Sequence, residues 1–452
     1  GRVYDSSPSA DALGVPDCFS CHLLPQRASF DLFLVPLELL GPCRELFGSV
    51  LMDVLEVLHL ASFQGPHATL VEPMVPNVVR HPFSKRDAER LLAGVGKERY
   101  ETSLREKQCR LRHGSTVPLG ELFDWSELVR WLQLARGIQG GISWEDFMLR
   151  TDRSLDVVAM LQEHEGGIGH NGDLSNASAT PCSDTDGALS APLRFHNEDF
   201  RVIRRVCVRR GHENERLLLD MDRLSEAVRQ AVRGAQAEGR TWAAVGFFLP
   251  MVEGAERARA SPGRYAKGSS HLAYASIWQG LRFEASLRAQ AVRVLEVLNL
   301  RGTRFLAAHW RRGDTDSPHL SPDPNRRKQG HLASADNFAA LLRRHLSERG
   351  LRHVLLMANI APGGPEASEL ALHLGGDVRL LQVPLVWRSD RQALRQLCLE
   401  MALAVEADFF LAFGSGLLQG HISKPSLMVI QMRLHAKALP LETNAFAFVE
   451  ES

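Results

Sequence analysis

The hydrophobic residues in the second half of the chain follow two periodicities that alternate at regular intervals. Short apolar runs are typical of buried strands, and here they begin at Phe305 and continue at residues 353–358, 378–383, 409–412 and 427–432. Between them, apolar residues recur at helical spacing over residues 283–298, 337–349, 365–374 and 391–406. Strands that alternate with helices form parallel sheets with crossover helices, so the pattern predicts an α/β fold of the Rossmann type.

The first half shows a looser version of the same pattern. Its predicted strands cover residues 30–37, 69–73 and 243–250. Its predicted helices cover residues 46–60, 125–134, with Asp124 as the N-cap, and 217–236. The order strand, helix, strand at the start of this half also favours a parallel α/β arrangement.

The length of 452 residues exceeds what one hydrophobic core usually organises, so we expect two domains. The formal net charge is zero, which excludes an overall field that would attract nucleic acid, and no apolar run is long enough to cross a bilayer. Residues 166–192 are rich in Gly, Ser, Asn and Thr and predict a flexible insertion. The expected division is an irregular lead-in at 1–28, an N-terminal Rossmann-like domain at 29–245 containing this insertion, and a C-terminal Rossmann-like domain at 246–452.

The segment after the strand at Phe305 carries the clearest chemistry of the chain. It places His309, Arg311, Arg312 and Asp314 directly after buried apolar residues. In an open α/β sheet, ligands bind just beyond the carboxyl ends of the strands. Guanidinium groups suit phosphate because they present planar, permanently charged donors. The segment therefore predicts a phosphate site.

Two other motifs overlap these residues. Arg312, Gly313 and Asp314 spell the adhesion tripeptide, but a strand-end position would hold it within the fold. Asp314 and Asp316 have the spacing of an aspartate pair that binds a metal and a nucleotide, which would imply Mg²⁺ or Mn²⁺. Because the neighbouring arginines can neutralise a diphosphate themselves, we expect a site without a metal.

A glycine-serine turn provides a second candidate for phosphate binding. The helix at 391–406 leads into the strand at 409–412 and then into Gly414, Ser415 and Gly416. Small residues allow backbone N–H groups to approach a phosphate closely. The turn follows a strand in the same half as His309, so both segments predict one site.

The cysteines and the single sequon say little about the cellular compartment. Cys18 and Cys21, followed by His22, match the attachment pattern of c-type haem, but no haem domain surrounds them. A local disulfide or two free thiols is the favoured interpretation. The sequon at Asn176 favours the secretory pathway.

Together these segments resemble the GDP-fucose protein O-fucosyltransferase family of GT-B glycosyltransferases. In that family a strand is followed by His-x-Arg-x-x-Asp, which is matched here by His309, Arg311 and Asp314. A later motif joins an acidic residue, Ala-Asp-x-Phe and a serine-rich turn, matched by Glu400, Ala407, Asp408, Phe410 and Ser415. Weaker likeness at 69–73 and 117–124 extends the resemblance over most of residues 30–433.

The resemblance implies a GT-B fold with two Rossmann-like domains facing a cleft, the N-terminal one on the acceptor side. It implies an inverting enzyme that transfers fucose from GDP-fucose to a Ser or Thr hydroxyl of a protein, without metal or cofactor. Arg311 and His309 would be catalytic, because they would stabilise the charge that develops on the β-phosphate. Asp314 would orient the arginines, and Glu400 would contact guanine or ribose. The implied GDP-fucose ligands are His309, Arg311, Arg312, Asp314, Glu400, Asp408, Gly414 and Ser415. The expected location is the lumen of the endoplasmic reticulum or Golgi, with a membrane anchor outside this chain.

The first loop departs from the family pattern. The usual Gly-Gly…Asn-x-Arg run is replaced by residues 41–48, which contain no Asn and no clearly aligned Arg. After Asp408, Gly416, Leu417 and Leu418 stand where Ser, Thr and Phe are usual. Two alternatives remain open: a fucosyltransferase that acts on glycans, whose relatives share a His-x-Arg-Arg segment, and a non-catalytic GT-B module that binds a nucleotide sugar or a protein. The altered first loop favours the second alternative.

Overall fold

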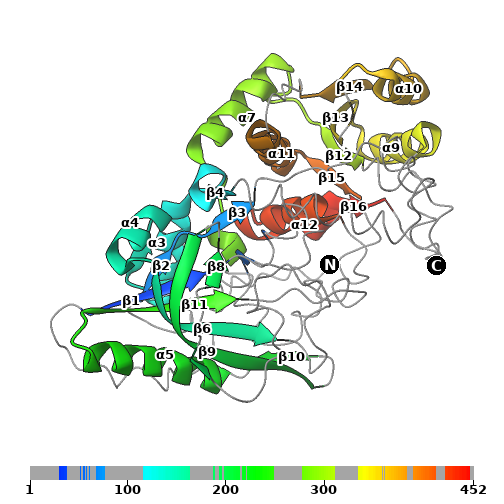
Figure 1. Ribbon diagram of the computed structural model, residues 1–452. Helices are drawn as coiled ribbons and strands as arrows, with labels where there is room; N and C mark the ends of the chain where they lie inside the picture. Colours follow the sequence, from blue (N-terminus) through cyan, green and yellow to red (C-terminus); the bar gives the residue numbers. More distant parts are fainter. Residues whose placement is uncertain are drawn as a thin grey trace, which may run out of the picture.

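The chain forms two mainly parallel sheets flanked by helices, as a computed structural model shows (Figure 1). The first sheet is built from the first half of the sequence and the second sheet from the second half. The structure describes residues 30–37, 51, 54, 55, 58, 61, 68–76, 116–162, 187–188, 193–195, 198–213, 216–219, 221–248, 277–310, 334–358, 360, 362–383, 390–413 and 423–447.

The first sheet has a parallel core with antiparallel additions at one edge. The parallel strands lie in the order β9-β6-β11-β1-β2-β5, and β7, β8 and β10 pair antiparallel with β9. A separate two-stranded sheet joins β3 (Met74–Pro76) to β4 (Thr116–Pro118). The strands of the first sheet are β1 (Asp31–Pro36), β2 (Thr69–Val71), β5 (Gly140–Ile142), β6 (Ser154–Gln162), β7 (Gly187–Ala188), β8 (Leu193–Phe195), β9 (Glu198–Glu213), β10 (Arg216–Leu219) and β11 (Trp242–Phe248).

Helices cover both faces of the first sheet. Successive side chains of a strand point to opposite faces, and β1 follows this rule. Phe33 packs in one cluster with Phe147 of α4 (Trp144–Thr151). Leu34 belongs to the opposite cluster, which includes residues of α3 (Trp125–Arg136), of α5 (Met221–Ala237) and the described helical positions 51, 54, 55, 58 and 61. The first sheet is therefore the middle layer of three, with α5 running along it in Figure 1.

The second sheet is entirely parallel and has the order β14-β13-β12-β15-β16. From β12 the chain first builds outward through β13 to β14, then returns to the other side of β12 for β15 and β16. The strand order thus reverses between β12 and β15, which makes their carboxyl ends the topological switch point. The strands are β12 (Leu306–Trp310), β13 (His353–Ala358), β14 (Arg379–Gln382), β15 (Phe409–Ala412) and β16 (Asn444–Phe446).

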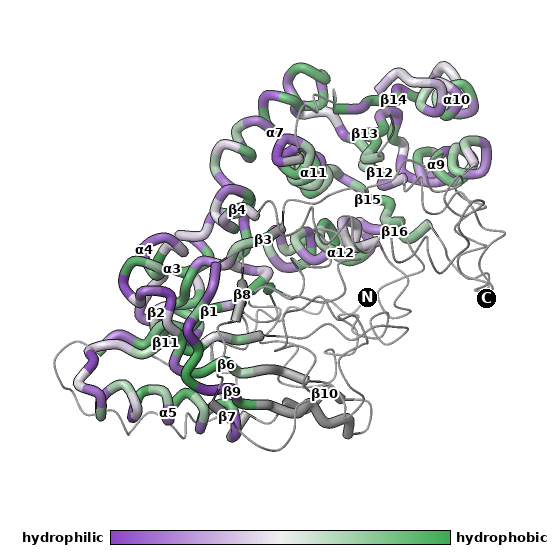
Figure 2. The backbone as a smooth tube through the Cα atoms, in the orientation of Figure 1, coloured by the Kyte–Doolittle hydropathy of each residue, from purple (hydrophilic) through white to green (hydrophobic). Residues whose placement is uncertain are grey.

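The side chains of β12 show how the second sheet is covered. Leu306, Ala308 and Trp310 pack with α9 (Ala335–Arg349) and α10 (Pro365–Leu374), and Trp310 stacks on Phe338 with ring centroids 5.3 Å apart. Ala307 joins the other cluster, with α7 (Ala285–Val297), α11 (Asp390–Val405) and α12 (Lys424–Gln431). Figure 2 shows the hydrophobic strands β12, β13 and β15 between helices that are only partly hydrophobic.

A short backbone joint connects the two sheets. Phe123, just after the short 3₁₀ helix η2 (Leu119–Glu121), forms an antiparallel bridge with Phe283, just before α7, and their rings stack at 5.2 Å. Arg391 of α11 reaches across the joint to Glu121, with 2.6 Å between Nη2 and Oε2. The apolar cluster on the α11 face of the second sheet continues through this joint into the first. The two sheets therefore share one continuous core.

Most predicted elements are confirmed. The strands at 353–358 and 409–412 and the helix at 365–374 have the predicted bounds. Asp124 caps α3 as expected, since its side chain accepts a hydrogen bond from the backbone N–H of Glu127. Described positions 51, 54, 55, 58 and 61 are helical, as the spacing of apolar residues predicted. The α/β class with parallel sheets is thereby shown.

Two predicted elements are wrong. Residues 427–432 were expected to form a strand, but they lie in α12 and in the π-helix Met432–Ala436 that follows it. All six side chains are buried, and a short run that is apolar on every side cannot distinguish a strand from a buried helix. The predicted helix at 217–236 is also wrong at its start, because residues up to Leu219 form β10 and α5 begins at Met221.

Two of the expected domain limits can be compared with described strands. β11 runs to Phe248, so a boundary after residue 245 falls inside a strand of the first sheet. Gly187–Ala188, within the expected insertion at 166–192, forms β7 and pairs with β9. The lead-in at 1–28, the loop at 41–48 and residues 166–186 lie outside the described residues.

Candidate functional site

His309 lies on β12 at the carboxyl end of the second sheet. The neighbouring strand β15 pairs with β12 in parallel, with Ala308 opposite Leu411, so both strands end side by side. This is the switch point of the sheet, where open α/β folds leave a crevice for ligands. Because side chains alternate along a strand, His309 points to the same face as Ala307, the face covered by α11 and α12.

Ser426 of α12 connects His309 to the end of β15. The distance between His309 Nδ1 and Ser426 Oγ is 2.8 Å. The same Oγ accepts a hydrogen bond of 2.9 Å from the backbone N–H of Phe413, the residue after β15. Ser426 is 0% exposed, so this hydroxyl is a buried link between the two central strands.

The start of α12 places this serine. Ser423 is the N-cap residue, Pro425 stands in the first helical turn, and the Ser423 N–H donates to the Phe413 carbonyl at 2.9 Å. Sequence reasoning missed Ser426 because it assigned residues 427–432 to a strand. The Ser-Lys-Pro sequence at 423–425 is a helix-start signal that would have identified the helix.

The other residues of the predicted phosphate site lie just beyond the described strands. Arg311, Arg312 and Asp314 follow β12, and Gly414 and Ser415 follow β15; all five are outside the described residues. The structure describes the residues that directly precede the two segments. The last described residues before these segments, Trp310 and Phe413, lie at the ends of the adjacent strands β12 and β15, and the roles of the five residues stay predictions.

Asp408 lies at the opposite, amino end of the second sheet. Its Oδ2 accepts a hydrogen bond of 2.9 Å from the Phe305 N–H, and its own N–H donates to the Phe305 carbonyl at 3.1 Å. Arg304 makes an exposed ion pair with its other oxygen. Asp408 therefore joins the starts of β12 and β15, and it does not share the end of the sheet where His309 lies.

Glu400 is buried in the middle of α11. Gln396, one turn earlier, donates to its Oε1 at 3.1 Å. Burial raises the pKa of the Glu400 carboxyl to about 8, so the group is mainly protonated at neutral pH.

Arg433, in the π-helix after α12, was not identified from the sequence. Its guanidinium is 0% exposed and donates to the carbonyls of Ala404, Val405 and Ala407 at the end of α11, at distances of 2.6 to 3.2 Å. Nε also donates to Asn444 Oδ1 on β16, at 2.9 Å. A cation at a helix C-terminus satisfies carbonyls that have no partner within the helix. Arg433 is therefore a structural residue at the amino end of the sheet.

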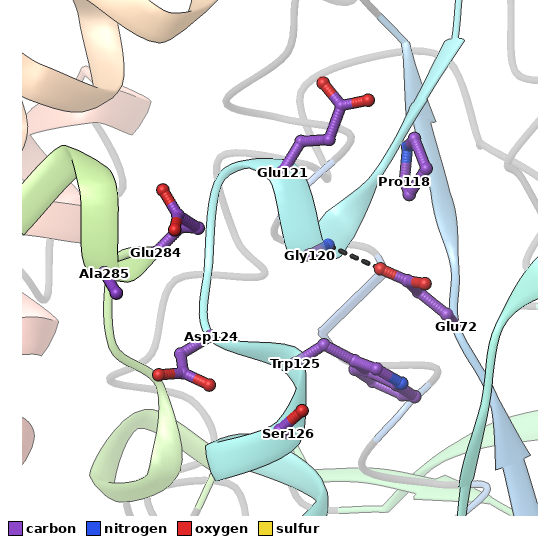
Figure 3. Close-up of a pocket in the computed structure, with 9 residues that line it drawn as sticks. All are labelled: Glu72, Pro118, Gly120, Glu121, Asp124, Trp125, Ser126, Glu284 and Ala285. Carbon is purple, nitrogen blue, oxygen red and sulfur yellow. Dashed lines mark hydrogen bonds between the residues drawn. The ribbon is translucent and has the colours of Figure 1, made fainter.

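A cavity of about 410 Å³ lies at the joint between the two sheets (Figure 3). Its wall combines the end of β2, η2 and the first turns of α3 and α7. Figure 3 shows carboxylates from each of these elements around the same space. The lining residues are Glu72, Pro118, Gly120, Glu121, Asp124, Trp125, Ser126, Glu284 and Ala285.

Glu72 is the most deeply buried carboxylate of this cavity. It follows β2 at the carboxyl end of the first sheet and is 8% exposed. Its Oε1 accepts a hydrogen bond of 2.6 Å from the Gly120 N–H, and a Cβ at Gly120 would lie 2.5 Å from that oxygen. Burial raises the pKa of Glu72, an effect that the Gly120 bond opposes and that Glu121 and Glu145 reinforce. Glu72 lies within the stretch 69–73 that resembles the family, but neither that stretch nor any other motif gave this residue a role.

The described residues were compared with the requirements of a metal site and of a membrane-spanning helix. Among them, no group of three or more His, Cys, Asp and Glu side chains is placed to hold a metal ion. Because Asp314 and Asp316 lie outside these residues, metal independence stays a prediction. The described part of the chain also contains no helix long and apolar enough to span a membrane. Cys18, Cys21 and Asn176 lie outside the described residues.

Comparison with known proteins gives a likeness of fold. No protein-family model matches the sequence, and no curated protein matches it. A crystal structure of POFUT1 in complex with GDP has a TM-score of 0.50 and 12% identity to this chain, over 93% of this chain and 99% of POFUT1. A second, of POFUT1 in complex with GDP-fucose, has a TM-score of 0.48 and 13% identity, over 94% and 100%. The chain thus has a mixed α/β fold that matches, at a distance, the fold of a fucosyltransferase.

Proposed function

We propose that this protein is a GT-B glycosyltransferase that transfers fucose from GDP-fucose to a Ser or Thr hydroxyl of a protein, with inversion and without a metal. The observation that carries the proposal is the placement of His309 and its buried partner Ser426 at the switch point of the second sheet. The segments that hold Arg311 and Ser415 leave from this point. The fold shared with POFUT1, which was crystallised with GDP, supports the same ligand class.

The donor site is assigned to the segments after β12 and β15. Departure of GDP builds negative charge on its β-phosphate, and preorganised donors at that position lower the barrier. In this proposal Arg311, Arg312 and His309 supply side-chain donors, Asp314 orients the arginines, and the turn that follows Phe413 (Gly414 and Ser415) supplies backbone N–H groups. We leave Asp408 and Glu400 out of the donor site, because one lies at the amino end of the sheet and the other is buried and mainly protonated.

The acceptor side is assigned to the cavity at the joint, with Glu72 as the general base. The bond from the fucose anomeric carbon to the GDP oxygen breaks while a bond to the acceptor oxygen forms on the opposite face. The acceptor hydroxyl must lose its proton, and the proton passes to the Glu72 carboxylate. A carboxyl whose pKa is raised by burial is a stronger base than an exposed one, and Glu72 meets this requirement.

Calorimetric titration with GDP and GDP-fucose tests the donor site. We expect both to bind with micromolar dissociation constants, and mass spectrometry to detect fucose on a peptide acceptor. If neither ligand binds at high micromolar concentration, the enzyme assignment fails. Addition of EDTA should leave transfer unchanged, and loss of activity that Mg²⁺ or Mn²⁺ restores would refute the metal-free mechanism.

The Glu72→Gln variant tests the acceptor side separately. It keeps an acceptor for the Gly120 N–H but removes the base, so transfer should fall by about a hundredfold or more while GDP affinity is unchanged. Glu145→Gln is the matched control, because Glu145 acts on Glu72 only through its charge and does not line the cavity. Equal activity of the two variants would remove Glu72 from the mechanism.

Two alternatives have distinct outcomes. The altered first loop at 41–48 favours a non-catalytic GT-B module, which would bind GDP-fucose but transfer fucose to no peptide and no glycan. A glycan-directed fucosyltransferase would use oligosaccharides in preference to peptides. A panel of peptide and glycan acceptors, with labelled GDP-fucose, distinguishes the three.

We also propose that the protein lies in the lumen of the endoplasmic reticulum or Golgi, where it would meet secretory proteins as acceptors. The sequon at Asn176 provides the test. We expect mass spectrometry of protein purified from animal cells to find N-glycan on Asn176. Unmodified Asn176 in every preparation would argue against this compartment.

A further inference from the structure

The hydroxyl of Ser426 has two hydrogen-bond partners among the described residues, and together they determine a proton position. Its Oγ lies 2.9 Å from the Phe413 nitrogen and 2.8 Å from His309 Nδ1. A backbone N–H only donates, so Oγ is the acceptor in the bond with Phe413. The hydroxyl hydrogen then remains to be placed.

His309 Nδ1 is the acceptor that the described residues offer this hydrogen. Ser426 is 0% exposed, so its hydroxyl has no contact with bulk solvent. A buried hydroxyl that donates to no acceptor destabilises the fold, because it loses the hydrogen bond that water supplies in the unfolded chain. If Nδ1 instead carried a hydrogen and donated it to Oγ, the hydroxyl hydrogen would have no acceptor among the described residues. The arrangement with the Ser426 O–H donating to Nδ1 satisfies every group.

We propose that Ser426 is a positioning residue that holds His309 as the neutral Nε2–H tautomer at the switch point of the second sheet. A neutral imidazole has one donor nitrogen and one acceptor nitrogen, and the bond at one of them determines the state of the other. With Nδ1 occupied as an acceptor, Nε2 is the donor. Through Phe413, the same hydroxyl ties the orientation of the ring to the backbone from which the 414–422 segment leaves.

The consequence for ligand binding rests on the proposed function. A donor nitrogen suits an oxyanion such as the diphosphate of GDP, whereas an acceptor nitrogen would repel it. Ser426 would therefore make His309 a fixed donor without itself touching the ligand. Ser426 would determine the orientation of the His309 ring and which of its nitrogens carries the hydrogen, and each of these can be measured.

Nitrogen NMR of the ligand-free protein measures the tautomer directly. The protein is labelled with ¹⁵N in its 18 histidine rings, and the His309 signals are identified by their loss in His309→Gln. At a pH where the ring is neutral, we expect a protonated Nε2 and an unprotonated, hydrogen-bonded Nδ1. A protonated Nδ1 in the wild-type protein would overturn the proposal. This test needs no variant of Ser426 and no ligand.

Variants of Ser426 test its part in the tautomer and in binding. Ser426→Ala removes the donor, so the two tautomers should mix and GDP affinity should fall roughly tenfold. Ser426→Thr keeps the hydroxyl and should restore both. Ser423→Ala is the matched control, because Ser423 begins the same helix but its side chain makes no capping hydrogen bond. A Ser426→Ala protein that is folded, with the wild-type tautomer and affinity, would refute the inference.

The two readouts separate this inference from the proposed function. If wild-type protein shows the Nε2–H tautomer, and Ser426→Ala loses it, the positioning role is supported even where GDP does not bind. In that case the proposed function fails alone. If GDP binds but His309 carries its hydrogen on Nδ1, the positioning role fails and the donor site stands.

Discussion

The two ends of the second sheet use polar residues in different ways. At the amino end, Asp408 and Arg433 bind backbone groups of the strands and helices beside them, and Arg433 is fully buried. At the carboxyl end, His309 and Ser426 link side chains to each other and to the residue after β15. One end is closed by polar contacts to the backbone, while the other ends in segments rich in Arg, Gly and Ser.

The difference shows how residues of one sequence motif come to have separate roles. Glu400, Asp408 and Ser415 belong to one stretch of chain that resembles a fucosyltransferase motif. Glu400 lies within α11, Asp408 lies just before β15, and Ser415 lies outside the described residues. Conversely, Ser426 lies outside the motif and within contact of His309.

Replacing Arg433 should have the largest effect on stability. Arg433→Met leaves the carbonyls at the end of α11 without their donor, and we expect a loss of about 3–5 kcal/mol in the free energy of unfolding. Urea denaturation measures it. Lys437→Met is the control, because the Lys437 side chain forms an exposed ion pair with Glu406 among the described residues, and its loss should change stability by less than about 1 kcal/mol. Equal losses in both variants would refute the structural role of Arg433.

Glu400, between the two ends, should make stability fall with rising pH. Its pKa is about 8 in the folded protein against a usual 4.5, so the unfolded chain ionises first as the pH rises. The contribution of protonated Glu400 to the free energy of unfolding is fully present below pH 4.5. It is lost as the pH rises through 8, and the loss is at most about 5 kcal/mol. Glu400→Gln should remove this dependence between pH 5 and pH 9. A wild-type protein whose pH profile matches that of the variant would contradict the buried, neutral state.

Asp408 should show a smaller effect, confined to stability. Asp408→Ala removes the acceptor of the Phe305 N–H and should cost about 1–2 kcal/mol. If the amino end is structural, GDP affinity should stay within about twofold of wild type. A large loss of affinity in a stable Asp408→Ala protein would restore Asp408 to the donor site and remove the contrast between the two ends.

The sequence predicted the second sheet well, because its elements have unambiguous patterns. The strands at 353–358 and 409–412 are bounded apolar runs, and Pro365 and Gly375 mark the ends of α10. The strand predicted at 427–432 is wrong because all six side chains are buried, which removes the alternation of buried and exposed positions that marks a helix. In the first sheet, β9 was missed because charged residues such as Arg201, Arg204 and Glu198 interrupt its apolar positions.

The site was predictable in part, for a physical reason. His309 could be placed at the end of a strand from local sequence, since a short apolar run precedes it. Ser426 and Glu72 could not, because their contacts with His309 and Gly120 join residues 117 and 48 positions apart. Asp408 was placed in the site by its motif, although its side chain binds the backbone at the other end of the sheet.

Calorimetric titration of GDP into the wild-type protein, His309→Ala and Asp408→Ala tests the central claim most directly. The claim is that the carboxyl end of the second sheet, and not its amino end, binds the nucleotide. We predict micromolar binding to the wild type, binding at least about tenfold weaker to folded His309→Ala, and unchanged binding to Asp408→Ala. Binding that His309→Ala leaves intact, or that Asp408→Ala abolishes, would contradict the account.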